Sequence, residues 1–226
     1  MKSATRVYAA TFGAIMALAG IEHGIGEILQ GNVAPEGIMV LSWPEAEFFR
    51  GLGGEPAMTV IPNLLVTGIL AVIVSLALLV WSLLFVHRKK GGLIMMLLSG
   101  ALLLVGGGIF PPVFAMLIGA AATRMHTSTS SMKAQRADGL RRVLARLWPW
   151  SYAVCVLAWP AVFPVGYFWG EKNPAFLLVV LFIALGTLLL SLFASFAYDR
   201  QMRVDAGAYH STEVDLFTEI SVKLGA

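Results

Sequence analysis

Residues 106–112 read Gly-Gly-Gly-Ile-Phe-Pro-Pro and interrupt an apolar region that otherwise runs from Gly91 to Ala122. Three glycines and two adjacent prolines disfavour a continuous helix, because glycine is flexible and proline lacks the backbone N–H that a helix interior needs. The apolar region is therefore either one long helix or a hairpin of two helices with its tip at residues 106–112. This choice decides the topology of the whole chain.

Composition identifies the class of protein. Of the 226 residues, 58% are hydrophobic and only 13% are charged, whereas a soluble domain has about 25% charged residues. The mean hydropathy is +0.80. We therefore expect an all-α, polytopic integral membrane protein. The single cysteine, Cys155, excludes an intrachain disulfide framework and a thiolate metal cluster, and the net charge of +3 does not imply a nucleic-acid partner.

The basic residues favour the hairpin. With two helices between residues 91 and 128, fourteen of the sixteen lysines and arginines lie on one side of the membrane, leaving only Arg50 and Lys172 on the other. With one long helix, only six would lie on that side. Because lysine and arginine gather in cytoplasmic loops, six spans with both termini in the cytoplasm are predicted, and five spans are the alternative. The second leg of the hairpin is short for a span, with about a dozen apolar residues against the usual ~17.

The predicted organisation is a membrane domain of residues 1–198 followed by a cytoplasmic tail of residues 199–226. Ala17-Leu18-Ala19 could be a signal-peptide cleavage site, but the hydrophobic run continues to Leu29, so the first span is expected to be retained. In the tail, Thr212 and Asp215 resemble a capping box and predict a short separate helix. The six spans are expected at about residues 7–30, 59–86, 91–109, 111–128, 149–169 and 174–198.

A basic amphipathic helix is predicted between Arg136 and Trp148, before the fifth span. Its apolar residues recur with the period of a helix, and its arginines lie between them, so we expect it to lie on the inner leaflet. Anionic lipid headgroups are the expected partners of its arginines, which are Arg136, Arg141, Arg142 and Arg146.

The first span carries three ionisable residues, Glu22, His23 and Glu27, within the run from Val7 to Gln30. An ionisable side chain at bilayer depth costs roughly 2.5–3.5 kcal/mol on insertion scales, so it normally faces protein or water. On a helix His23 and Glu27 lie about 40° apart, whereas Glu22 points about 100° away. His23 and Glu27 are therefore expected to share one site, and Glu22 is expected to lie apart from it.

Neighbouring residues suggest what surrounds this pair. Asn63 and Thr67 lie four residues apart, about one to two turns inside the predicted second span, at the same depth as the pair. They are the expected polar partners. Gly20, Gly24 and Gly31 form a stripe of small residues, the first two at GxxxG spacing, that allows a second helix to come close.

The loop of residues 31–58 is expected outside, because it contains four glutamates against one arginine, Arg50. Its apolar middle is unsuited to free solution, and Trp43 suits the membrane interface. Two interpretations stay open: a lid over the helix ends, or an interfacial anchor.

Metal or cofactor chemistry has weak support in the sequence. His23 and Glu27 could bind one metal, but a zinc site needs at least three protein ligands, and the others would have to come from Glu22, Glu55 or Asn63. The chain has no standard nucleotide-binding or catalytic motif. Two-histidine haem ligation is not expected, because His87, His126 and His210 lie in predicted cytoplasmic segments. No cofactor is therefore predicted.

Three classes of function remain. The first is small-solute or ion- or proton-coupled transport through a polar site lined by Glu27, His23 and Asn63 in the outer half of the bilayer. The second is a membrane-embedded enzyme that acts on an amphiphilic substrate with Glu27 or His23 as base or metal ligand. The third is a structural or accessory subunit that binds a second copy or a membrane partner. A buried structural hydrogen bond between His23, Glu27 and a neighbouring helix is the plain alternative to any binding site.

Overall fold

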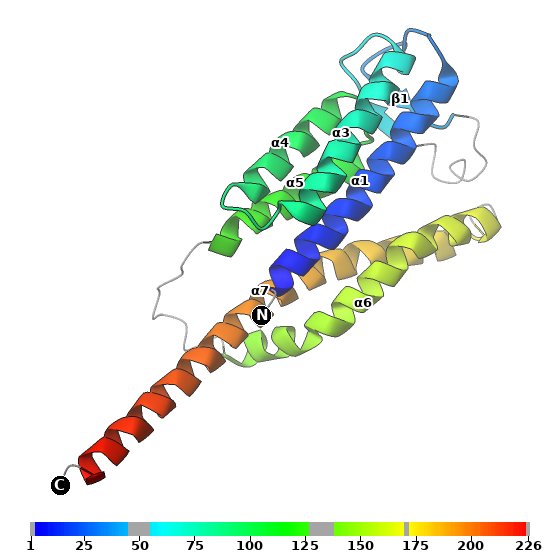
Figure 1. Ribbon diagram of the computed structural model, residues 1–226. Helices are drawn as coiled ribbons and strands as arrows, with labels where there is room; N and C mark the ends of the chain where they lie inside the picture. Colours follow the sequence, from blue (N-terminus) through cyan, green and yellow to red (C-terminus); the bar gives the residue numbers. More distant parts are fainter. Residues whose placement is uncertain (1–2, 45–54, 127–137, 170–171, 225–226) are drawn as a thin grey trace.

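The computed structural model describes residues 3–44, 55–126, 138–169 and 172–224. Within them the chain is helical apart from two three-residue strands and the connecting turns (Figure 1). In chain order the elements are α1 (Ala4–Gln30), β1 (Met39–Leu41), β2 (Pro56–Met58), α3 (Leu64–Leu84), α4 (Gly91–Leu104), α5 (Phe110–Thr123), the 3-10 helix η1 (Arg124–His126), α6 (Asp138–Trp169) and α7 (Pro174–Leu224).

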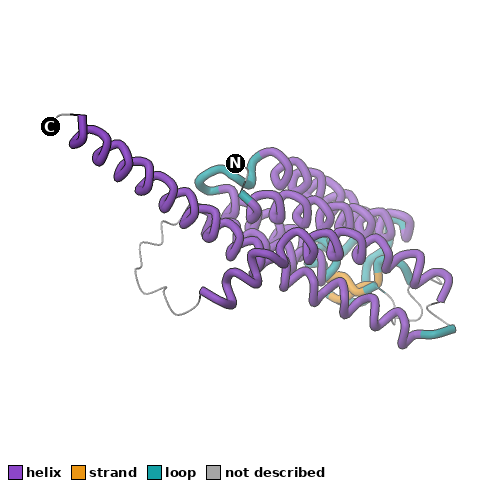
Figure 2. Tube along the Cα trace, turned by 90° about the horizontal axis from the view of Figure 1, so that it is seen from below, coloured by secondary structure: helices purple, strands orange, loops and turns teal. Residues whose placement is uncertain are grey.

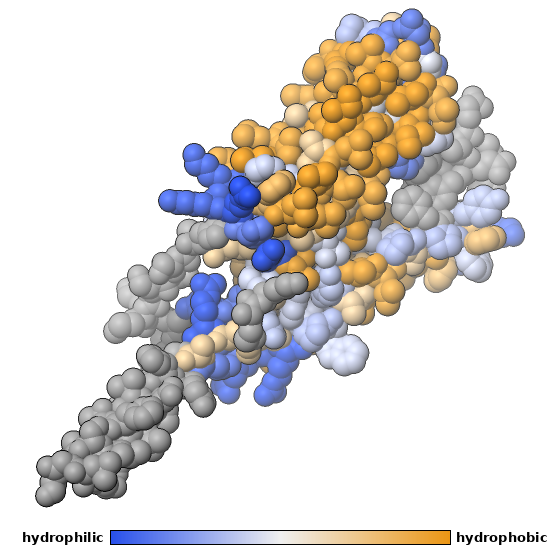
Figure 3. Space-filling model, viewed as in Figure 1, coloured by the Kyte–Doolittle hydropathy of each residue, from blue (hydrophilic) through white to orange (hydrophobic). Residues whose placement is uncertain are grey.

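Among the described residues, three helices are long and apolar enough to cross a membrane: α1, α3 and the Ala175–Ala206 part of α7. Two more apolar helices, α4 and α5, have fourteen residues each. Large apolar side chains such as Leu76, Leu97 and Phe182 are exposed on these helices, and Figure 3 shows hydrophobic side chains over most of one face of the bundle. A soluble protein rarely exposes so large an apolar surface. The fold is therefore that of a helical membrane protein.

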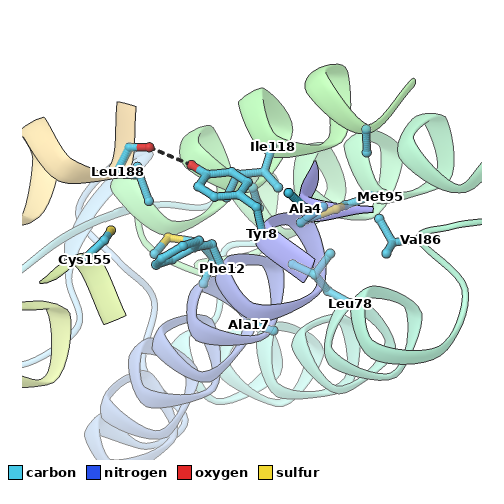
Figure 4. Close-up of a cluster of buried hydrophobic side chains, with 14 of the residues drawn as sticks. Ala4, Tyr8, Phe12, Ala17, Leu78, Val86, Met95, Ile118, Cys155 and Leu188 are labelled. Atoms are coloured by element: carbon cyan, nitrogen blue, oxygen red, sulfur yellow. Dashed lines mark hydrogen bonds between the residues drawn. The ribbon is translucent and has the colours of Figure 1, made fainter. Parts of the chain in front are cut away.

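Helix α1 lies at the centre of the fold. It packs against α3, α5 and α7, while α6 and α7 pack against each other as a long pair (Figures 1 and 2). Tyr8 and Phe12 of α1 are almost fully buried among residues of the surrounding helices (Figure 4). The Tyr8 hydroxyl donates a hydrogen bond of 3.0 Å to the carbonyl of Leu188 on α7. The hydrophobic core thus joins α1 both to α3 and α5 and to the pair of α6 and α7.

Asp199 of α7 ties that helix to the beginning of α1. Its carboxylate accepts hydrogen bonds from the backbone N–H groups of Ala4, at 2.6 Å, and Thr5, at 3.0 Å, and from the hydroxyl of Ser3. The first N–H groups of a helix have no partner within the helix, and a carboxylate there also interacts favourably with the helix dipole. Asp199 therefore caps α1 from another helix.

The apolar region of residues 91–122 is a helical hairpin. Helix α4 ends at Leu104, and α5 begins at Phe110 with Pro111 and Pro112 in its first turn, where proline is tolerated. Between them Gly106 and Gly108 have φ angles of 87° and 82°, which side chains rarely allow. Helix α4 is shorter than the expected range 91–109 because the glycines end it early, and α5 is shorter than the expected range 111–128 because it ends at Thr123, where η1 follows. Residues 127 and 128 lie outside the described residues.

The hairpin tip meets residues 58–60 at one end of the bundle. Strands β1 and β2 pair antiparallel, with Met39 opposite Met58. Thr59 forms a bridge with Val105, and Gly106 N–H donates to the carbonyl of Met58 at 2.9 Å. Residues 59–63 are thus part of this connection, and α3 begins at Leu64 instead of about residue 59.

Two expected helix boundaries are wrong. The predicted inner-leaflet helix and fifth span are one helix, α6, which contains Pro149, Pro160 and Pro164. The tail does not start a new helix at Thr212, because α7 continues from Pro174 to Leu224. The residues of α7 after Asp199 include no proline and a single glycine, which a helix tolerates, so no strong helix breaker separates them from the span. Arg136 of the predicted amphipathic segment lies outside the described residues.

Candidate functional site

Glu27 is buried without a partner near the end of α1. Its side chain is 0% exposed, and neither carboxylate oxygen has a hydrogen-bond partner among the described residues. Gly106 covers it: a Cβ atom added at Gly106 would collide with both oxygens. Burying a carboxylate without hydrogen bonds or a counter-charge is costly, so this position favours a bound proton or cation.

His23, one turn earlier, is held between two carboxylates. It is 3% exposed, and Gly108 lies against its ring. Its Nδ1 is 3.0 Å from the carbonyl oxygen of Ala19 and 3.2 Å from Oε2 of Glu22, and its Nε2 is 3.4 Å from Oε1 of Glu55. Because a carbonyl oxygen only accepts, Nδ1 carries a proton, and in the neutral imidazole Nε2 then carries the lone pair.

Glu55 is the residue directly before β2, and its side chain reaches this site. Its backbone carbonyl accepts a hydrogen bond of 3.0 Å from Ser42 N–H, which extends the pairing of β1 and β2. Burial, together with the negative charge of the neighbouring Glu22, raises the pKa of the Glu55 carboxyl to about 9. The second carboxylate oxygen, Oε2, is buried without a partner among the described residues.

Ser42 and Trp43 close the site from a third direction. Gln30 holds them, because its side-chain N–H group donates to the carbonyls of Leu41, at 2.9 Å, and Ser42, at 3.0 Å. The indole of Trp43 lies against Gly26, where a Cβ atom would be only 2.7 Å from the ring. The Ser42 side chain lies beside Glu27, and its hydroxyl is buried without a hydrogen-bond partner among the described residues.

These residues form one polar cluster, which we define as Glu22, His23, Glu27, Ser42 and Glu55. The two α1 residues His23 and Glu27 lie under the same turn, Gly106–Gly108, as their shared face predicts. The prediction that Glu22 lies apart is wrong. The Glu22 carboxylate contacts Nδ1 of His23. The angle between two residues around a helix describes only their Cα–Cβ directions, and a glutamate side chain is long enough to turn back toward a neighbouring face.

Asn63 and Thr67 make their hydrogen bonds elsewhere. Asn63 is the N-cap of α3, where its oxygen accepts from Val66 N–H at 3.0 Å, and its amide donates to Asn32. Asn63 is therefore at the end of α3 and not one or two turns inside it. Asparagine is a preferred N-cap residue, and here it follows a proline, so it favours the start of a helix. Thr67 is buried and bonds Thr59 at 2.6 Å between hydroxyl oxygens. Whether either residue takes part in binding stays a prediction.

The small residues of α1 bring α3 close beneath the cluster. A Cβ atom at Gly24 would be 2.8 Å from the carbonyl oxygen of Gly68, and one at Gly20 would collide with the hydroxyl of Ser75. Gly31 is not part of this contact. It is the residue that ends α1, with a φ of 85° and open space around it.

The sequence did not indicate the residues that cover the cluster. Ser42, Gly106 and Gly108 come from segments far from α1 in the chain, and their approach depends on the hairpin and on the pairing of β1 with β2. The glycine run itself was visible, but only as a helix break. Glu55 was visible only as one of several acidic residues that could supply a further metal ligand.

No protein-family model, curated protein or solved structure matches this chain. The possible chemistry therefore follows from the cluster alone. It contains three carboxyl groups, and within the described part of the chain their only ion-pair partner is His23. Buried charges need a partner or are neutralised by protons. The cluster can therefore take up protons or a cation.

Proposed function

We propose that this protein carries out ion- or proton-coupled transport, with Glu27 as the carboxylate that binds the coupling cation or proton. The observation that carries the proposal is the complete burial of Glu27 with both carboxylate oxygens unpartnered among the described residues. In membrane proteins such a carboxylate commonly marks an ion or proton pathway. For Glu27, the plain alternative of a structural hydrogen bond between this pair and a neighbouring helix finds no such bond among the described residues.

The segments that cover the cluster support a mechanism in which the site is closed here and opens when these segments move. The three covering segments are the Gly106–Gly108 turn, the Ser42–Trp43 pair and the residue before β2. They are connections and not helices, and Gly106 and Gly108 permit backbone changes that other residues resist. Movement of these segments would expose Glu27 to water while the helices stay packed.

The proposed topology has six spans, with the N-terminus in the cytoplasm and the polar cluster in the outer half of the bilayer. The charge distribution supports it, because the basic residues of the 88–90 and 141–146 segments would all lie inside. The hairpin of α4 and α5 and the later part of α6 supply the three spans beyond α1, α3 and α7. The fourteen residues of α4 and of α5 correspond to about 21 Å each at 1.5 Å per residue, so the bilayer would have to be locally thinner there.

Anionic lipid headgroups are the proposed partners of the first part of α6. Exposed Leu140, Val143 and Leu147 alternate with Arg141, Arg142 and Arg146 along this helix. Such a helix lies well at the headgroup level, with its apolar side chains in the acyl region and its arginines near lipid phosphates.

Cation currents from reconstituted protein test the transport proposal. Proteoliposomes on a solid-supported membrane would receive concentration jumps of H⁺, Na⁺, K⁺, Mg²⁺ and Zn²⁺. We expect a current with at least one of these cations from the parent protein and from Glu36→Gln, a matched control whose exposed side chain lies in the loop after α1. Glu27→Gln should insert normally and give no current. A parent protein silent to all five cations, or a fully active Glu27→Gln, would overturn the proposal.

A further inference from the structure

Three side chains in the polar cluster have the arrangement of metal ligands. One ligand atom from each of Glu22, His23 and Glu55 lies within 4.8 Å of the other two. The ligands of a tetrahedral zinc ion, with bonds of about 2.0–2.2 Å, lie roughly 3.5 Å apart. The two glutamate side chains have three rotatable bonds each and can rotate to shorten this spacing.

The hydrogen bonding of His23 prepares one nitrogen for this role. Nδ1 lies 3.0 Å from the Ala19 carbonyl and is thereby held as the proton-bearing nitrogen. A backbone carbonyl on the second nitrogen is a common way to orient a metal-binding histidine. Nε2 then points its lone pair towards Oε1 of Glu55 at 3.4 Å. Two lone pairs face each other favourably only with a proton or a cation between them.

Unsatisfied oxygens in the same cluster point independently to a missing positive charge. Glu27 is 0% exposed and lies with His23 under the Gly106–Gly108 turn, yet neither of its oxygens has a partner among the described residues. Oε2 of Glu55 is buried and equally unpartnered there. A divalent cation at the three ligands would offset the negative charge of these carboxylates at short range.

We propose that Glu22, His23 and Glu55 bind one divalent transition-metal ion of the Mn²⁺ to Zn²⁺ series. One imidazole nitrogen and two carboxylate oxygens suit these ions, and soft ions that prefer sulfur are excluded by the donor set. Three protein ligands leave a further position for water. The ion would join α1 to the segment before β2 and so fasten the cover over Glu27. The proposal does not depend on the transport function.

Metal titration of the purified full-length chain tests the site. The protein would be freed of any polyhistidine tag, stripped with a chelator, and titrated with Zn²⁺ by calorimetry and with Co²⁺ by visible absorption. We expect one Zn²⁺ per chain and a Co²⁺ spectrum typical of nitrogen and oxygen ligands. Glu55→Gln should weaken Zn²⁺ binding by at least about tenfold, the lower end of what loss of a partner near a metal causes.

Two further variants make the result specific. Glu36→Gln removes the same charge from the same loop, outside the cluster, and should bind Zn²⁺ as the parent does. His23→Gln should abolish the Co²⁺ spectrum, and if it does not fold, Glu22→Gln provides the second test from α1. The proposal is overturned if the parent binds less than one Zn²⁺ per chain, which is the result expected if His23 is an imidazolium paired with the two carboxylates. It is also overturned if Glu55→Gln binds Zn²⁺ like the parent.

Discussion

Glu27 is enclosed by residues that come from three separate segments of the chain. Gly106 lies against its carboxylate, Ser42 lies beside it, and Gly24 and Gly68 bring the two supporting helices together beneath it. At each of the three glycines an added side chain would enter space that the carboxylate or a helix backbone already occupies. These glycines thus determine the site as much as the ionisable residues do.

Replacing Gly106 tests this cover directly. In Gly106→Ala the new Cβ atom would meet the Glu27 carboxylate at a φ of 87°, so we expect a loss of stability of about 1–3 kcal/mol. Thermal unfolding in detergent, followed by tryptophan fluorescence, measures it. The control is Gly100→Ala on α4, where a Cβ meets nothing and helix propensity predicts up to about 1 kcal/mol of stabilisation. Equal behaviour of the two variants would contradict the described packing.

Helical spacing predicts which residues of one helix share a face, but it does not predict which residues of other segments contact them. The spacing of His23 and Glu27 placed both on one face, and the structure finds both buried under the same turn. The position of Glu22 was misjudged because its side chain bends back along the helix. The cover from Ser42 and Gly106 could not be predicted, because it depends on how distant segments pack.

Among the elements, α1 is the one that the others contact most widely, and its two ends are fixed differently. Asp199 of α7 caps the beginning, while Gln30 near the other end holds Leu41 and Ser42. Composition and periodicity predicted the apolar helices, but several ends were misplaced. Helix ends depend on local signals such as the Asn63 cap and the Gly106–Gly108 turn, which compete with a continuous hydrophobic run.

Removing the cap from Asp199 should loosen the contact between α7 and α1. Asp199→Ala loses three hydrogen bonds at the start of α1, and we expect a loss of about 1–2 kcal/mol, as for other N-cap removals. Asp205→Ala is the control, since Asp205 is exposed on the same helix and bonds only Gln201 within it. Thermal unfolding of both variants is the measurement. A stability of Asp199→Ala equal to that of Asp205→Ala would rule out the cap.

The lipid contact proposed for α6 predicts a specific thermal effect. Added phosphatidylglycerol should raise the unfolding temperature of the parent more than phosphatidylcholine does, because arginine interacts with anionic headgroups at about 1 kcal/mol each. In a variant with Arg141, Arg142 and Arg146 all changed to glutamine, the difference between the two lipids should shrink. The same difference in parent and variant would exclude this helix as the contact.

For the whole molecule, the polar connections divide between the two ends of the bundle. Residues 31–44 and 55–63 and the Gly106–Gly108 turn lie at the end that carries the polar cluster (Figure 1). The start of α1, η1 and Asp199 meet at the other end, where Ser3, Met125 and Asp199 line a common cavity. The class of protein follows from composition alone, whereas the number of spans depends on the helix break at residues 106–108.

We propose six spans, which place the polar cluster outside and the basic segments inside. Cysteine labelling with a membrane-impermeant reagent in intact cells tests it most directly, in a background where Cys155 is replaced by alanine. We predict that Glu36→Cys reacts from outside, whereas Ser130→Cys and Glu219→Cys react only after the membrane is permeabilised. Labelling of Ser130→Cys in intact cells, or protection of Glu36→Cys there, would contradict the six-span topology and the outer position of Glu27.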